Sequence, residues 1–162
     1  MELDMAYKNE IKEKIQIILK EEPQNYTYIS ITVVNEFSRI LQLSKSSGLS
    51  LRHTTYSILE GLDEALQDHT AQKEKIFQAV TKAMAEVAYN SAKKEIQKIK
   101  SLPLDKKNIA EKIESERAHL EDIAEGFKEY VLENGYHLLA QSVEKVQNAA
   151  DNIGADLHLH NS

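Results

Sequence analysis

Proline and glycine interrupt helices, and their scarcity is the feature that most restricts how this chain can fold. The 162 residues include two prolines and five glycines. From residue 49 to residue 102 there is no proline, and the single glycine is Gly61. Pro103 then separates two helix-favouring stretches, from Ser50 to Lys100 and from Asp105 to Asn152. This arrangement predicts two helical arms joined by a turn at Pro103.

Apolar side chains recur every three or four residues along most of the chain, which predicts amphipathic helices. The stripes begin at Tyr7, Ile29, Leu51, Ile76, Ile109 and Leu138. Each arm has one weak point, near Thr70 and at Asn134-Gly135, at similar distances from Pro103. Either the arms form a bent hairpin with arms of ~75 Å, or they fold back into a compact bundle. We predict an all-α fold, an antiparallel bundle of five or six helices around a hairpin that turns at Pro103.

The second segment admits two interpretations. Isoleucine and valine alternate over residues 29–33 as in a strand. Phe37 and Ile40 instead continue these residues as a helical stripe, and a lone strand would have no partner. We therefore predict a helix over residues 25–45, with Gly48 as its C-terminal glycine.

The remaining boundaries follow from capping residues and polarity. Asp105 is expected to cap the second arm, and Thr70 or Asp68 to cap a new helix within the first arm. The last helix is expected to end near Asn152. We predict one helical domain over residues 1–154 and a polar C-terminal tail over residues 155–162.

Composition excludes several classes of function. There is no cysteine, so disulfides, thiolate metal sites and cysteine nucleophiles are excluded. The net charge of −6 disfavours general binding to nucleic acids. The N-terminal residues lack the apolar run of a secretory signal, and no apolar stretch is long enough to span a bilayer. We expect a soluble, cytoplasmic protein.

Two motifs have spacings that suit metal ligands. Glu116 and His119 match the Glu-x-x-His of di-iron bundles, but the sequence has no second copy of that motif. The alternative is a glutamate at the edge of the seam, paired with a lysine or arginine of a neighbouring helix. Asp156, His158 and His160 alternate near the C-terminus, where a flexible tail is the alternative to a nickel or zinc site. We predict no metal, cofactor or catalytic residue.

Charge is segregated along the second arm. Glu121, Glu125, Glu129 and Glu133 form a ladder of like charge at helical spacing. The ladder is either a docking face for a basic partner or a solvated helix face relieved by Lys128.

The sign reverses around Pro103, where six lysines lie within 15 residues. They are Lys93, Lys94, Lys98, Lys100, Lys106 and Lys107. Such a cluster could contact an anionic surface, or it could simply complement helix dipoles.

The other histidines do not form a recognisable catalytic constellation. His53, His69 and His137 lie near apolar positions, which favours partly buried core residues over catalytic bases. No serine–histidine–aspartate arrangement and no glycine-rich phosphate loop is present.

A short pattern recurs with an offset of 65 residues. Arg52 precedes Glu60-Gly61-Leu62 as Arg117 precedes Glu125-Gly126-Phe127. Either a helical unit is duplicated, with glycines at close helix crossings, or two amphipathic helices match by chance. A glycine inside a helix costs about 1 kcal/mol relative to alanine, which favours a packing role for both.

Residues 57–66, Ser-Ile-Leu-Glu-Gly-Leu-Asp-Glu-Ala-Leu, are followed by an alanine-rich helix. The alanines are Ala79, Ala83, Ala85, Ala88 and Ala92. Over residues 46–100 the chain resembles a family of small, uncharacterised bacterial all-helical proteins, which has no established activity to transfer. In size, lack of cysteine and alanine-rich helices it is also similar to phasins, which coat polyester storage granules.

These observations favour a non-catalytic structural or protein-interaction module with a protein partner or self-association as a homo-oligomer. The alternative is a phasin-like coat on a lipid or polymer granule, which the acidic polar faces and few aromatics make less favoured. A metal-dependent enzyme that uses Glu116 and His119 is the least favoured hypothesis.

Overall fold

The computed structural model describes residues 2–21, 26–48, 50–135 and 139–161, and in these ranges it contains six helices and no strand. The helices are α1 (Glu2–Glu21), α2 (Tyr26–Ser47), α3 (Leu51–Ala65), α4 (Thr70–Lys100), α5 (Lys106–Asn134) and α6 (Ala140–Asn161). The predicted all-α bundle is confirmed.

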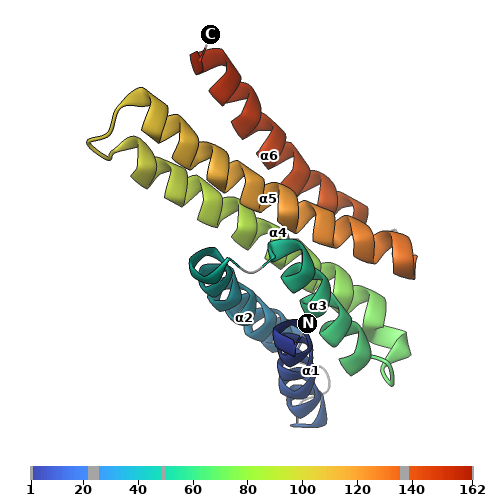
Figure 1. Cartoon of the computed structure of the whole chain (residues 1–162). Helices are drawn as coiled ribbons and strands as arrows, with labels where there is room; N and C mark the ends of the chain where they lie inside the picture. The colour runs from blue at the N-terminus through green and yellow to red at the C-terminus, as the bar shows by residue number, and fades with distance from the viewer. Residues whose placement is uncertain (1, 22–25, 49, 136–138, 162) are drawn as a thin grey trace.

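The long hairpin of α4 and α5 is the frame of the fold (Figure 1). The two arms are broken, so the bent hairpin with ~75 Å arms does not form. Helix α3 folds back to pack against α5, and α6 packs along α5 and α4. Helix α1 packs against α3, and α2 packs against α4. The chain therefore adopts the second predicted geometry, a hairpin folded back into a bundle.

The segment that could have been a strand is helical. Ile29, Val33, Phe37 and Ile40 are all fully buried, whereas Ile31 is half exposed. A helical period of 3.6 residues explains this burial pattern, and a strand period of two does not. The stripe gains its stability from packing on neighbouring helices, which outweighs the weak preference of β-branched residues for strands.

Helix ends confirm several predicted stop signals. Asp105 caps α5, because its Oδ1 accepts a hydrogen bond of 2.8 Å from the backbone N–H of Asn108. Gly48 and Gly135 follow α2 and α5 with φ angles of 73° and 71°, a left-handed conformation that glycine adopts without strain.

Two predicted boundaries are wrong. The N-cap of α4 is His69, whose side chain makes no capping hydrogen bond, and neither Thr70 nor Asp68 takes that role. Helix α6 continues to Asn161, so the predicted boundary between residues 154 and 155 falls inside a continuous helix. Ile153 packs against the core and Leu157 is half-buried, so packing outweighs the glycine at position 154.

The buried stripe of α4 is wider than predicted. Ile76 and Val80 are buried as expected, but beyond them the fully buried residues are Met84, Ala85 and Ala88. The predicted positions Ala83, Val87 and Ser91 are only half-buried. Helix α4 contacts α2, α5 and α6, so no single narrow stripe satisfies all three neighbours.

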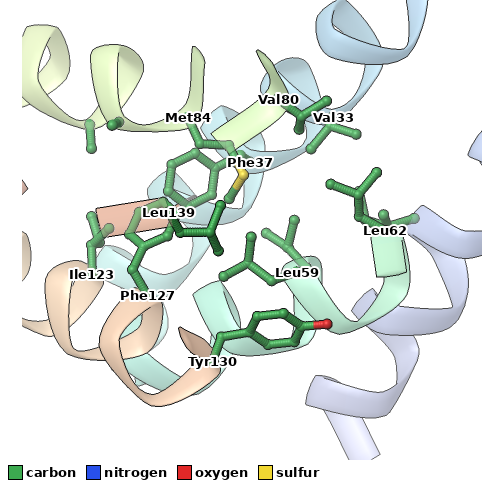
Figure 2. Packing of buried hydrophobic residues seen from close by; sticks show 14 of the residues in the cluster. Val33, Phe37, Leu59, Leu62, Val80, Met84, Ile123, Phe127, Tyr130 and Leu139 are labelled. Carbon is green, nitrogen blue, oxygen red and sulfur yellow. The ribbon is translucent and has the colours of Figure 1, made fainter. Parts of the chain in front are cut away.

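The core gathers side chains from both ends of the chain. Figure 2 shows Phe37 of α2, Met84 of α4 and Phe127 of α5 converging beside Leu139. Tyr130 lies below them, buried, with its hydroxyl donating a hydrogen bond to Oδ2 of Asp63. Polar groups at the edge of the core are thus paired across helices.

Both glycines of the recurring pattern lie at close helix crossings. A Cβ atom on Gly61 would stand 2.5 Å from the carbonyl oxygen of Lys8 in α1. A Cβ atom on Gly126 would stand 2.6 Å from the carbonyl oxygen of Arg52 in α3. Because the obstructing atoms belong to backbones, they cannot move aside without shifting a helix. The predicted role of the two glycines in close packing is confirmed.

The two crossings also share an ion pair. Nζ of Lys8 lies 2.8 Å from Oε1 of Glu64, three residues after Gly61. Arg52 pairs with Glu129, three residues after Gly126. In each case a basic residue on one helix offers its backbone to a glycine and its side chain to the following glutamate. The 65-residue repeat therefore corresponds to a repeated mode of helix packing.

Thr55 lies directly beneath Gly126 and has a buried hydroxyl without a hydrogen-bond partner. Its neighbour Thr54 donates to the carbonyl oxygen of Ser50 at 2.8 Å. Replacing Thr55 with valine, which has the same shape, removes an unsatisfied polar group and is expected to raise the free energy of unfolding by about 1 kcal/mol. The same change at Thr54 is expected to lower it. Chemical denaturation of both variants measures the difference, and equal effects would contradict this assignment.

Candidate functional site

Glu116 is the predicted metal ligand with the most unusual environment. It is only 7% exposed, and its Oε2 accepts a hydrogen bond of 3.0 Å from Nζ of Lys45 on α2. His119 Nδ1 lies 3.7 Å from Oε1, beyond hydrogen-bond distance, and has no hydrogen-bond partner. The interpretation of Glu116 as a seam-edge residue paired with a neighbouring helix is therefore confirmed.

The electrostatics at Glu116 are those of an ion pair. Burial opposes ionisation of the carboxyl group, but the neighbouring His119 and Lys45 outweigh burial, and the pKa of Glu116 lies below its usual range. The adjoining cavity has a volume of ≈ 10 Å³, which suits at most a water molecule. In the described part of the chain, no three histidine or acidic side chains cluster in a way that could hold a metal ion.

The predicted C-terminal ligands lie on a continuous helix. Asp156 is exposed on α6. The side chains of His158 and His160 lie outside the described part of the structure, so that metal site stays a prediction.

The remaining histidines do not match the predicted core role. His53 is exposed near the start of α3, and His69 is a half-buried N-cap residue between helices. His137 lies outside the described residues.

The glutamate ladder of α5 is occupied by contacts within the molecule. Glu121 pairs with Arg117 at 2.5 Å, and Glu125 pairs with Lys128 at 3.3 Å. The other two rungs reach α3, where Arg52 binds Glu129 and the hydroxyl of Tyr56 donates to Glu133. Lys128 thus relieves one rung, as predicted, and the others join α5 to α3 or to its own preceding turn. These contacts disfavour the ladder as a docking face.

The lysines around Pro103 behave differently. All six are exposed, and within the described residues no ion pair joins any of them to an acidic side chain. Lys93 has its Nζ 6.0 Å from the ring centroid of Tyr89. The carboxylate of Asp105, the nearest acid in sequence to the turn, accepts the capping hydrogen bond of α5. Elsewhere in the bundle, basic residues such as Lys8 and Arg39 bind glutamates.

Two apolar side chains lie at the centre of these lysines. Leu102 and Leu104 are 41% and 39% exposed on either side of Pro103. Figure 1 shows this turn at the outer end of the α4–α5 hairpin, away from the end where α3 packs. We call the six lysines and these two leucines the basic tip. The lysines were recognised in the sequence, but the leucines were not, although a Leu-Pro-Leu turn between lysines was the available signal.

The larger surface depressions lack a convergent catalytic set. One of ≈ 380 Å³ lies between α2 and α4 and is lined by Gln42, Val87, Asn90, Ser91, Lys94, Glu95 and Lys98. Another of ≈ 230 Å³ lies between α4 and α6, with Ser142 as its one hydroxyl and no histidine or acid among its lining residues. A serine nucleophile needs an adjacent base, which this depression does not supply.

No described helix combines the length and the apolar character needed to cross a bilayer. Comparisons with protein-family models, curated proteins and solved structures find no match to this chain.

Proposed function

We propose that this protein is a non-catalytic helical module that acts through contact, with the basic tip as its contact surface. The observation that carries the proposal is the contrast in pairing. Buried and half-buried charges such as Glu116 have partners within the bundle. The lysines of the basic tip are exposed and have none among the described residues. Exposed charges of one sign on a protruding turn favour association with an oppositely charged partner.

Several further features belong to this proposal. The resemblance over residues 46–100 supports membership of a family of small bacterial helical proteins. The absence of cysteine and the net charge of −6 support a cytoplasmic location. The alternative of a phasin-like coat requires exposed apolar surface. The apolar stripes of the bundle pack against one another, so its folded form offers such surface chiefly as scattered residues and at the basic tip.

Site-directed photo-crosslinking in cells tests the proposal. A photo-reactive residue replaces Asn108, which is exposed beside the basic tip, or Gln67, which is exposed at the other end of α4. We expect products from position 108 and not from position 67. Reversing the charge of Lys98 and Lys100 is expected to remove these products. If position 108 gives no product with protein, lipid or a second copy, and light scattering shows a monomer, the proposal is wrong.

A further inference from the structure

We propose that the basic tip binds bilayers that carry anionic lipids, with Leu102 and Leu104 entering the headgroup region and the lysines contacting lipid phosphates. This inference rests on the proposed function, because it names the partner of the same surface. It is carried by three observations: the local charge, the exposed leucines and the convex shape of the turn.

The charge of the basic tip is opposite to that of the molecule. Residues 93–107 contain six lysines against Glu95 and Asp105, a balance of +4 in a chain with a net charge of −6. An anionic surface therefore attracts this end and repels the remainder, which orients the hairpin with its turn toward the surface. At physiological ionic strength the screening length is about 8 Å, so the distant acidic residues weaken this attraction little.

The leucines distinguish a bilayer from a soluble anion. Stable attachment to a membrane surface generally requires two signals, such as an apolar group together with a polybasic patch. Leu102 and Leu104 supply exposed apolar surface at the apex, and Lys100 and Lys106 directly flank them in sequence. A free phosphate or a polyanion would bind the lysines without using the leucines.

The shape of the turn favours a flat partner over a peptide. Every residue from Lys100 to Asn108 is exposed, so the apex forms a protrusion without a groove. Peptides and helices bind in grooves or along sheet edges, which enclose their side chains. A bilayer surface accommodates a protrusion, because the headgroups can part around two leucine side chains.

Vesicle flotation of the full-length chain tests the inference. The probes are phosphatidylcholine vesicles with and without phosphatidylserine, at low and at physiological ionic strength. We expect flotation with the anionic vesicles only, and weaker flotation at the higher salt concentration. A lysine near an anionic bilayer contributes about 1 kcal/mol, so Lys106→Glu with Lys107→Glu is expected to weaken binding at least about 25-fold.

A matched variant controls for net charge. Lys75 and Lys82 are exposed on α4, distant in sequence from Pro103, and have no ion pair within the described residues. Their reversal to glutamate makes the same change in net charge and is expected to weaken binding less than about fivefold, the contribution of one lysine. Circular dichroism confirms that each variant is folded.

A second variant separates the bilayer from a soluble anion. Leu102→Ser with Leu104→Ser is expected to reduce vesicle binding at least about tenfold, because it removes the apolar contribution. Its retention on a cation-exchange resin should equal that of the wild type.

Three results would overturn the inference. They are absence of flotation with anionic vesicles, equal losses in the two charge-reversal pairs, and unchanged binding by the leucine variant. Photo-crosslinking from position 108 to a protein, without flotation, would leave the proposed function standing and identify a protein partner in place of a membrane. Absence of both would contradict both proposals.

Discussion

Replacing Gly126 with alanine is expected to lower the free energy of unfolding by about 2–3 kcal/mol, as overpacking of a tight interface does. The added Cβ would stand 2.6 Å from the carbonyl oxygen of Arg52 and 2.8 Å from Cβ of Thr55. Neither atom can move unless α3 and α5 separate. Alanine would stabilise an unconstrained helix by about 1 kcal/mol, so the change is opposite in sign to the local preference. Urea denaturation followed by circular dichroism measures it.

Gly154 provides the matched control. A Cβ atom there would meet only Cδ of Arg117, at 3.2 Å, and that flexible side chain can move aside. Gly154→Ala is therefore expected to leave stability unchanged or to raise it by up to about 1 kcal/mol. Gly61→Ala should resemble Gly126→Ala, and Gly61→Leu should cost more than Gly61→Ala. Wild-type stability for both Gly61→Ala and Gly126→Ala would show that the crossings are not close.

Replacing Lys45 with methionine is expected to lower the free energy of unfolding at pH 7 by about 3 kcal/mol, because it leaves the buried carboxylate of Glu116 without its partner. Replacing both residues with methionine removes the stranded charge and should restore most of the loss. The comparison of the two single variants with the double variant measures the coupling between the residues. If Lys45→Met had the stability of the wild type, the ion pair would have no structural role.

The pH dependence of stability should reverse between the two proteins. In the wild type the pKa of Glu116 lies below its ordinary value of 4.5, so its contribution is present above that value and is lost as the pH falls through the folded-state pKa. Without Lys45, burial dominates and raises the pKa of Glu116. The variant is then most stable at low pH, where the carboxyl is protonated, and loses stability as the pH rises. Lys45 and His119 are the charged or titratable groups that line the cavity beside Glu116, so the Glu116→Gln variant isolates its contribution.

Local patterns predicted much of the fold, because burial and helical period agree along each element. The stripe through Ile29, Val33 and Phe37 identified a helix where composition alone suggested a strand, and all three residues are buried. The cap of α4 was missed, because a cap contributes only about 1 kcal/mol and packing of the flanking helices can override it. The end of α6 was missed for the same reason, since Ile153 packs beyond the predicted stop.

The candidate site divides in a similar way. The lysines of the basic tip are consecutive in the chain, so a pattern in the sequence could reveal them. Lys45 and Glu116 are separated by 71 positions, and their pairing depends on how α2 and α5 lie in the bundle. The partners of the glutamate ladder likewise come from α3. A single sequence provides no direct signal for contacts of this kind.

Helix α3 is the short element held at both glycine crossings. Its Gly61 lies against α1, and its Arg52 and Thr55 lie beneath Gly126 of α5. The N-terminal helix can therefore detach while α3 stays clamped to α5, but α3 cannot leave without breaking both contacts. In native-state hydrogen exchange, the amides of α3 should open with the global unfolding of the protein, and those of α1 should open earlier as a separate cooperative unit. The order in which the bundle comes apart is thus set by two residues that have no side chain.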